Sequence, residues 1–534
     1  MNPQINETRT GNKIGRVLLY VMFGFLLLIS VAGVAICIWY KNTFDLEFKA
    51  LLYVMSSPLQ GTGAETVKEV ITAGLPPMIA AAIVYVIAVL LIERKVSITN
   101  AKAAKWLKRA GALLCVFSLV FSLVFAVYSF RLPKYIALSG GETSFYEEYY
   151  VDPDSVKIVS EGKPKNLIYI YLESMESTYA SVEEGGRQQE NYMPYLTVMA
   201  KDNVSFTEKT DGNLGGFISP QGTGWTVAAL LATSSGIPFS FPLGENGNNN
   251  MSKEKYFASG LTTLGDILHD KGYTQVFMCG SNIEFGGRDK YYIQHGSYDI
   301  YDLETARNNG DVPKDYHNGF WGFEDNILFD IAKRQITSLA AGDDPFNFTM
   351  LTVDAHHNAG YICDLCGDDY DYLAEKHAQT ANVITCIDKQ VAEFVDWCKM
   401  QPWYEDTVIV ISGDHPRMDI YLVSRIPYAE RTVYNCFINS AVEPAAGYET
   451  GRTWTAFDMF PSTLAAMGFE IRGERLGLGT NMFSGLPTLA EELGFDYLET
   501  EIQKFSAYYI NEFCPELADR VVETEPVDTG VPAE

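Results

Sequence analysis

The stretch NLIYIYLES, residues 166–174, decides the fold of the larger part of the chain. From Leu167 to Leu172 it is an unbroken run of apolar and aromatic residues, typical of a strand that is buried on both faces. Such strands belong to parallel sheets whose faces are covered by helices. The stretch therefore predicts an α/β domain, and Glu173 follows the carboxyl end of its first strand.

Further apolar runs alternate with amphipathic segments along the chain. The other expected strands are TQVFMCG (274–280), FNFTMLTV (346–353), TVIVIS (407–412) and TVYNCFI (432–438). Helices are expected over residues 226–234, 262–271, 321–336 and 374–400. This alternation predicts a mostly parallel central sheet flanked by helices, in a domain that covers residues 166–514.

Polar residues follow three of the expected strands. Glu173 follows the first, Asp354 and His356 follow the strand at 346–353, and Asp414 and His415 follow the strand at 407–412. In an open α/β sheet, ligands bind beyond the carboxyl ends of the strands. Carboxylates and imidazoles gathered there suit one divalent cation of the zinc, manganese or magnesium kind.

The segment QGTGWTVAAL, residues 221–230, places Thr226 after a glycine-rich turn and at the start of an apolar run. One interpretation is a helix cap, a common role for threonine in this position. The other is a nucleophile, which requires a metal because a threonine hydroxyl is a poor nucleophile at neutral pH. Residues 221–230 alone favour the cap, whereas Glu173 and the pair Asp414–His415 favour the nucleophile.

Three apolar stretches long enough to cross a bilayer lie in a predicted membrane domain, residues 1–131. They cover residues 17–40, 75–92 and 112–130, and the first is too long for the apolar core of a signal peptide. The loop ERKVSITNAKAAKWLKRA between the second and third is strongly basic, which predicts a cytoplasmic loop, a cytoplasmic N-terminus and an extracytoplasmic main domain. Residues 132–165 are expected to be a linker, and the acidic tail, residues 515–534, to be disordered.

The composition restricts the partners and the cysteine chemistry. A formal net charge of −27 argues against nucleic acid or an anionic membrane surface as the main partner. Nine cysteines include the CDLC motif, Cys363 to Cys366, with Cys386 and Cys398 further along. In an extracytoplasmic domain a structural disulfide among them is favoured over a zinc site, because one CxxC pair alone is weak support for zinc.

Several motifs together resemble the lipoteichoic acid synthase and phosphoglycerol transferase family of the alkaline phosphatase and sulfatase superfamily. They are NLIYIYLES, GTGWT, GGRDKYYIQHGSYDIYD, WGFEDN, TVDAHHNAG, SGDHP and RLGLGTNMFSG. The GTGWT and DAHHNAG segments are more similar to the glucan-modifying phosphoglycerol transferases than to the polymer synthases. The resemblance covers most of the chain and implies a sulfatase-like extracytoplasmic domain behind membrane helices, although this chain has fewer spans than the typical five.

The resemblance also implies a set of site residues. Glu173, Thr226, Asp414 and His415 would hold one divalent metal ion, commonly Mn²⁺ in the synthases, with Mg²⁺ or Zn²⁺ as alternatives. Thr226 would be the nucleophile, and Arg288 and His356 would bind the glycerol phosphate group. The pattern departs from the family at two places: Gly286 replaces a tryptophan of the synthases, and Asn358 replaces a proline of the glucan-modifying enzymes.

By this resemblance, the protein is expected in a bacterial cell membrane as a phosphotransferase. It would move glycerol phosphate from phosphatidylglycerol to an envelope glycan, a glycolipid or a polyglycerolphosphate chain. The alternatives are a phosphoethanolamine transferase, a phosphodiesterase, a sulfatase, or a non-catalytic receptor for envelope polymers. The Cys/Ser-x-Pro-x-Arg motif that sulfatase activity requires is absent from the sequence.

Overall fold

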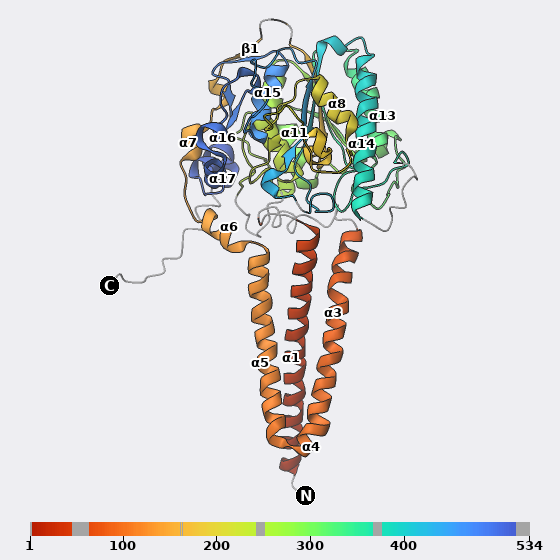
Figure 1. Cartoon of the computed structure of the whole chain (residues 1–534), viewed down its shortest axis with the longest axis vertical. Coiled ribbons are helices and arrows are strands. Elements are labelled where there is room, and N and C mark those ends of the chain that lie inside the picture. Colours follow the sequence, from red (N-terminus) through yellow and green to blue (C-terminus); the bar gives the residue numbers. More distant parts are fainter. Residues whose placement is uncertain are drawn as a thin grey trace, which may run out of the picture. The chain divides into compact units, whose positions relative to one another are not determined.

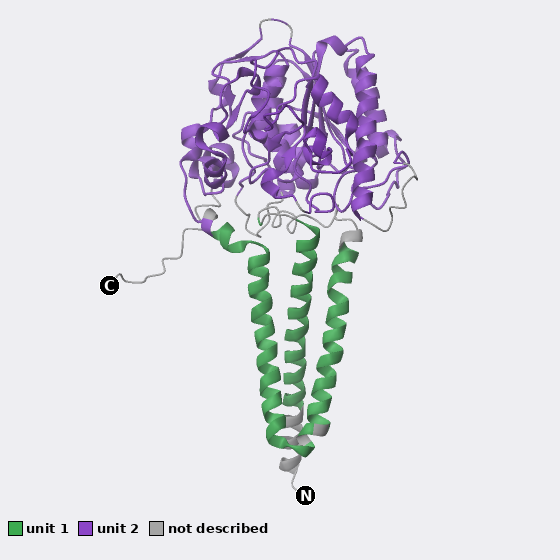
Figure 2. Cartoon of the chain, viewed as in Figure 1, with its two compact units in different colours: residues 1–48, 63–136 green, residues 49–62, 137–534 purple. Residues whose placement is uncertain are grey.

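The computed structural model describes residues 3–44, 48, 64–160, 162, 164–241, 251–366, 376–424 and 426–518. The chain divides into two compact units, which Figure 2 shows in different colours. Unit 1 comprises residues 1–48 and 63–136, and unit 2 comprises residues 49–62 and 137–534.

Unit 1 consists mainly of three long apolar helices (Figure 1). They are α1 (Pro3–Thr43), α3 (Ala64–Leu91) and α5 (Ala101–Ser129). Within the described residues, three segments are long and apolar enough to cross a membrane: Ile14–Thr43, Val67–Arg94 and Ala101–Ser129. They contain nearly all of the predicted spans, and their exposed apolar side chains, such as Leu18 and Phe117, suit hydrocarbon better than water.

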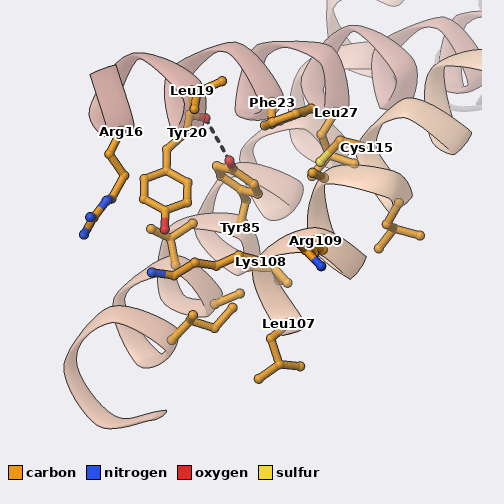
Figure 3. Close-up of a pocket in the computed structure, with 17 residues that line it drawn as sticks. Arg16, Leu19, Tyr20, Phe23, Leu27, Tyr85, Leu107, Lys108, Arg109 and Cys115 are labelled. Carbon is orange, nitrogen blue, oxygen red and sulfur yellow. Dashed lines mark hydrogen bonds between the residues drawn. The ribbon is translucent and has the colours of Figure 1, made fainter. Parts of the chain in front are cut away.

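A pocket of about 410 Å³ lies among the three long helices at the end that carries the basic residues (Figure 3). Its walls are apolar except for a few residues, among them Arg16, Lys108 and Arg109. The Tyr85 hydroxyl donates to the Tyr20 carbonyl oxygen at 2.8 Å and closes one side of it. Arg16, near the N-terminus, therefore lies at the same end of unit 1 as Lys108 and Arg109 of the basic segment.

Unit 2 is built on one central sheet. In its described part, six strands follow in the order β5-β4-β6-β2-β7-β9. They are β5 (Asp299–Tyr301), β4 (Thr274–Cys279), β6 (Phe346–Leu351), β2 (Asn166–Leu172), β7 (Thr407–Gly413) and β9 (Asn435–Ile438). Every neighbouring pair is parallel except β7 and β9, which are antiparallel.

Helices cover both faces of this sheet because side chains alternate between the faces along each strand. Ile168 and Ile170 belong to the core cluster on one face, with residues of α8 (Pro194–Asp202), α13 (Asp325–Leu339) and α14 (Lys376–Lys399). On the other face the Tyr171 hydroxyl lies 2.9 Å from Thr233 Oγ1 on α9 (Thr226–Ser235). The predicted architecture, apolar N-terminal helices followed by an α/β domain with a mostly parallel central sheet flanked by helices, is confirmed.

Two predicted elements differ from the structure, and one strand was not predicted. TVYNCFI is not one strand: β8 (Thr432–Val433) pairs with β3 (Phe217–Ile218), β9 joins the main sheet, and the Tyr434 amide between them donates to the Met175 carbonyl oxygen at 3.2 Å. Strand β5 was not predicted, because three residues form no recognisable apolar run. The helix expected from residue 321 begins only at Asp325, so the WGFE segment before it is not helical.

The segment expected to be a linker contains regular structure. It includes α6 (Leu132–Ser139), α7 (Phe145–Tyr149) and β1 (Ile158–Val159), which pairs with β10 (Glu470–Ile471). The ring of Tyr146 is buried and packs edge to face against Tyr509, 5.2 Å between centroids. Burial of such aromatic side chains, rather than a regular apolar period, holds α7 against the rest of unit 2. In the predicted disordered tail, Pro515–Leu517 forms one turn of 3₁₀ helix, and residues 519–534 lie outside the described residues.

Candidate active site

The strand order brings three loops together at one edge of the sheet. Strand β2 lies between β6 and β7, and all three run in the same direction. The segments that follow them begin with Glu173, with Thr352 and with Asp414, respectively. The Ser174 amide donates to Asp414 Oδ1 at 2.7 Å, and the Glu173 amide donates to Thr352 Oγ1 at 2.9 Å. These hydrogen bonds hold the three loops side by side.

Four of the predicted ligand atoms converge at this edge. Thr226 Oγ1 lies 3.2 Å from Glu173 Oε2 and 3.4 Å from His415 Nε2. His415 Nε2 lies 3.4 Å from Asp414 Oδ2 and 3.6 Å from Glu173 Oε1. Ligands held about 2.1 Å from one ion in tetrahedral geometry are separated by roughly 3.4 Å, so the spacing fits a single small cation.

The hydrogen bonds in the site also leave lone pairs on His415 Nε2 and Asp414 Oδ2 available to a metal ion. His415 Nδ1 lies 2.9 Å from the Pro416 carbonyl oxygen, which can only accept, so Nδ1 carries the proton and the Nε2 lone pair faces the other ligands. Asp414 Oδ2 is buried and has no hydrogen-bond partner among the described residues. Two carboxylates, one imidazole and one hydroxyl therefore form a donor set that fits a divalent cation.

The electrostatics of the cluster support this interpretation. Burial, together with the neighbouring Glu173 carboxylate, raises the pKa of Asp414 to about 7. Burial opposes charge on His415, but the carboxylates of Asp414 and Glu173 outweigh it and raise the pKa of that imidazole. Negative charge that is concentrated and buried in this way is stabilised by a bound cation.

Thr226 is the first residue of α9, and its hydroxyl does not cap the helix. The N-cap position is Trp225, which makes no side-chain capping bond, and the Thr226 hydroxyl instead donates to Glu173. The turn before it requires Gly222, which has φ of 80° and would place a Cβ atom 2.9 Å from the Phe239 carbonyl oxygen. The glycine-rich turn and the start of α9 thus direct the Thr226 hydroxyl into the ligand set.

A second cluster contains the two predicted substrate-binding residues. Arg288 begins α11 (Arg288–Gln294), after the carboxyl end of β4, and its guanidinium carbon lies 5.2 Å from the ring centroid of Trp321. Trp321 also stacks on the His356 ring, 4.0 Å between ring centroids at an interplanar angle of 24°. Arg288 is buried, and its Nη1 has no hydrogen-bond partner within the part of the chain that is described. Such an unsatisfied, buried guanidinium is suited to bind a phosphate oxygen.

His356 is held as a neutral imidazole with one free lone pair. Burial lowers its pKa well below the usual value, and the neighbouring histidines His357 and His415 add to this effect. Its Nδ1 lies 2.9 Å from the His357 carbonyl oxygen and therefore carries the proton. Its Nε2 is thus an acceptor, which suits it to orient a hydroxyl group rather than to protonate a leaving oxygen.

The neighbouring His357 is expected to make stability depend on pH. Burial lowers its pKa to about 4, so below the ordinary value of about 6.5 the unfolded chain binds a proton that the folded chain does not. The free energy of unfolding is therefore highest above pH 6.5 and decreases as the pH falls. Protonation of His357 in the unfolded chain accounts for a decrease of about 2 kcal/mol between pH 7 and pH 5. Urea unfolding of the full chain at both pH values should show a smaller loss for His357→Gln than for wild type. His377→Gln, at an exposed histidine on α14, should keep the wild-type loss, and equal losses in all three proteins would contradict the assignment.

Sequence reasoning missed the buried ion pairs that support these loops. Arg417 Nε and Nη2 donate to the two oxygens of Asp419, each at 2.7 Å, while Arg417 Nη1 donates to the Ala355 carbonyl oxygen at 2.7 Å. Arg431 and Glu176 form a second buried pair nearby. The first pair joins the loop after β7 to the loop that carries His356. The position of Arg417 two residues after His415 was the only available sequence signal for it.

Asp354 also follows β6, but it does not join the ligand set. Its Oδ2 accepts from the Asp325 amide at 3.2 Å, and its own amide donates to Asp325 Oδ2 at 3.1 Å. Burial raises the pKa of Asp354 well above its ordinary value, and the Asp325 carboxylate contributes to this. Asp354 and Asp325 therefore link the start of α13 to the loop after β6.

The disulfide expected among Cys363, Cys366 and Cys386 is not formed in the structure. All nine cysteines lie in the described part of the chain and are free thiols. Cys363 Sγ lies 3.6 Å from Cys366 Sγ and 3.8 Å from Cys386 Sγ, whereas a disulfide bond is about 2.05 Å long. Cys398 is buried elsewhere on α14 and takes no part in this cluster.

Comparison with known proteins now places the chain in a family. The family model described as Sulfatase matches residues 165–469, which is more than half of the chain. The chain belongs to the sulfatase family. The superfamily that the motifs indicated is thereby confirmed, and Glu173, Thr226, Arg288, His356, Asp414 and His415 all lie inside the matched region.

Phosphoglycerol transferase I of Salmonella choleraesuis (strain SC-B67) is 33% identical to this sulfatase-family chain over 272 residues, which are 51% of this chain and 33% of that protein. The match thus spans about a third of the relative's length. The crystal structure of the lipoteichoic acid synthase LtaP from Listeria monocytogenes has 16% identity and a TM-score of 0.49, over 70% of this chain and 97% of that one. The structure of the C-terminal periplasmic domain of EcEptC from Escherichia coli in complex with Zn has 11% identity and a TM-score of 0.42. The match covers 60% of this chain and 87% of that chain.

Proposed function

We propose that the protein is a membrane-anchored phosphoglycerol transferase that works through a covalent intermediate on Thr226. The donor is phosphatidylglycerol, and the acceptor is a hydroxyl group of an envelope glycan, a glycolipid or a polyglycerolphosphate chain. The observation that carries the proposal is the position of Thr226 Oγ1, 3.2 Å from Glu173 Oε2 and 3.4 Å from His415 Nε2, on a residue that does not cap its helix. The similarity to phosphoglycerol transferase I supports the choice of substrate.

The proposed reaction has two steps at one phosphorus atom. In the first, Thr226 Oγ1 attacks the phosphorus of the lipid, the bond to the diacylglycerol oxygen breaks, and the proton lost by Thr226 is balanced by one gained by diacylglycerol. In the second, an acceptor hydroxyl attacks the glycerophosphoryl-threonine, and Thr226 leaves as a hydroxyl. Before the attack, Glu173 Oε2 accepts the hydrogen bond of the Thr226 hydroxyl and orients it.

Glu173, Thr226, Asp414 and His415 are the residues that would hold the divalent ion. When bound, such an ion lowers the pKa of a hydroxyl and offsets negative charge on phosphoryl oxygens. We propose Mn²⁺ for this site, on the resemblance to the synthases, although the spacing of the four donors also suits Zn²⁺. Comparing the activity of chelated protein after addition of Mn²⁺, Mg²⁺ or Zn²⁺ distinguishes these ions.

The cluster of Arg288, Trp321 and His356 is the proposed site for the glycerol phosphate group. Arg288 Nη1 faces a phosphoryl oxygen, and His356 Nε2 accepts a hydrogen bond from a glycerol hydroxyl. The synthases have a tryptophan where this chain has Gly286, and Trp321 supplies an indole to the same arginine from another loop. Trp321 therefore compensates for the missing side chain.

Replacing Trp321 by alanine is expected to raise KM for phosphatidylglycerol roughly three- to thirty-fold with a smaller effect on kcat. The lost contact between the ring and the Arg288 guanidinium is worth about 0.5–2 kcal/mol. Trp321→Phe keeps an aromatic face and should stay close to wild type. Steady-state kinetics of the three proteins test this, and a Trp321→Ala protein with unchanged KM would remove Trp321 from the substrate site.

We propose that the long helices of unit 1 are membrane spans, with a cytoplasmic N-terminus and the sheet domain outside. The basic loop near Lys108 and Arg109 supports this orientation by the positive-inside rule. Membrane anchoring keeps the enzyme in the same bilayer as its lipid donor. Labelling of single introduced cysteines by a membrane-impermeant reagent on intact cells tests the orientation.

The activity itself is tested with purified full-length protein in detergent, Mn²⁺ and phosphatidylglycerol with a fluorescent acyl chain. The proposal predicts release of fluorescent diacylglycerol and no release from labelled phosphatidylethanolamine. Release from phosphatidylethanolamine instead would establish a phosphoethanolamine transferase. No release from either lipid would favour a non-catalytic binding protein and would overturn the proposal.

A further inference from the structure

A cluster of three cysteines lies outside the ligand set of Thr226. Cys363 and Cys366 belong to the loop between β6 and α14, and Cys386 lies within α14. Their sulfur atoms all lie within 4.8 Å of one another, and the three side chains are 5%, 9% and 5% exposed. We propose that these three thiolates bind one Zn²⁺ ion, with solvent or a small ligand in the fourth position, and that the ion fastens this loop to α14.

Two of the distances between the sulfur atoms match those of sulfur ligands around one zinc ion, and the third is below 4.8 Å. A tetrahedral Zn²⁺ ion with Zn–S bonds of about 2.3 Å holds its sulfur ligands about 3.8 Å apart. The observed separations from Cys363 Sγ are 3.6 Å to Cys366 Sγ and 3.8 Å to Cys386 Sγ. One ion also uses all three sulfur atoms, whereas a disulfide would leave one thiol over.

Hydrogen bonds to the sulfur atoms support thiolates rather than neutral thiols. The Gln390 side-chain amide donates to Cys386 Sγ at 3.3 Å and to Cys363 Sγ at 3.8 Å. Next to it, the Cys366 amide donates to the Cys363 carbonyl oxygen at 3.0 Å and closes the turn that brings these two cysteines together. N–H groups directed at metal-binding sulfur atoms are the outer-shell contacts that orient such ligands.

The position of the cluster gives the ion a structural role. The chain that leaves β6 carries His356 and reaches Cys363 seven residues later. Between them it is attached to α14 by the Gln379 amide, which donates to the Gly360 carbonyl oxygen at 2.7 Å. A zinc ion shared by the loop and Cys386 adds a strong link between the segment with His356 and the long helix α14.

The test uses Co²⁺ as a spectroscopic substitute for Zn²⁺ in the full-length protein, reduced and stripped of metal in detergent. Thiolate-bound Co²⁺ absorbs in the near ultraviolet by charge transfer, and Co²⁺ at Glu173, Asp414 and His415 does not, because that set contains no sulfur. The proposal predicts this band at one Co²⁺ per chain, its loss on addition of Zn²⁺, and its loss in Cys386→Ser. Cys398→Ser, which changes another buried cysteine of α14, should keep the band.

Three outcomes decide against the proposal. Absence of the band in reduced wild-type protein would show that the three thiols pack without binding metal, and its persistence in Cys386→Ser would show that the band comes from thiolates other than this set of three. A disulfide between any two of these cysteines in protein purified without added oxidant, detected by non-reducing peptide mass spectrometry, would also overturn it. Both readouts are independent of transferase activity, so they separate this proposal from the proposed function.

Discussion

Replacement of Thr226 by alanine is expected to lower diacylglycerol release from phosphatidylglycerol at least about a thousand-fold. Losses of this size follow when the nucleophile of a covalent mechanism is removed. The residue lies at the start of α9, and its hydroxyl donates to Glu173 and lies 3.4 Å from His415 Nε2, with no bond to the helix backbone among the described residues. Its loss should therefore remove activity while leaving the fold intact, which the melting temperature checks in the same samples.

Two variants control this experiment. Thr226→Ser keeps a hydroxyl group at the same position and should retain measurable activity. Thr233→Ala removes a buried threonine hydroxyl from the same helix, where it lies 2.9 Å from the Tyr171 hydroxyl, and should remain active. Undiminished release by Thr226→Ala, or equal losses in Thr226→Ala and Thr233→Ala, would contradict the role of Thr226.

Replacement of Asp419 by alanine is expected to lower the free energy of unfolding by about 3–5 kcal/mol. The Asp419 carboxylate accepts two hydrogen bonds from Arg417 at 2.7 Å and one from the Ala359 amide at 3.0 Å, and both charged side chains are fully buried. Its removal leaves the Arg417 guanidinium buried without its counter-charge. Urea denaturation of the full chain measures the change.

Asp396→Ala is the matched control for this prediction. Asp396 pairs with Lys399 at 3.1 Å on the surface of α14 and is 70% exposed, so its loss should change stability by less than about 1 kcal/mol. Because Arg417 also joins the loop after β7 to the loop that carries His356, Asp419→Ala should reduce transfer as well. Equal stability of Asp419→Ala and Asp396→Ala would show that the buried pair contributes no more than a surface pair.

The sheet and the convergence of Glu173, Asp414 and His415 could be predicted from the sequence because both depend on short-range patterns. Apolar runs such as Leu167 to Leu172 mark strands buried on both faces, and the residue after each run lies at the carboxyl edge. Glu173 and Asp414 lie together because β2 and β7 are parallel neighbours. The edge strand β5 and the division of 432–438 between two sheets depend on pairing partners far away in the chain, which no local pattern reveals.

The supporting contacts of the site could not be predicted either, because they too join residues that lie far apart in the sequence. Trp321 meets His356 and Arg288 only after three separate loops have been brought to one edge of the sheet. Arg417 and Asp419 are two residues apart in the sequence, but their contribution to stability depends on their being buried. Charged residues are rarely buried, so no sequence pattern gave a reason to expect it. The CDLC motif led to a predicted disulfide that the structure does not contain, and the distances to Cys386 required the structure.

The most direct test of the central claim is to identify the covalent intermediate. Full-length protein is mixed with phosphatidylglycerol and Mn²⁺ without an acceptor, quenched in acid, digested and examined by peptide mass spectrometry. The account predicts one glycerophosphoryl group on the peptide that contains Thr226, located on that residue by fragmentation and absent from Thr226→Ala. Diacylglycerol release without any such adduct, or an adduct on another residue, would contradict it.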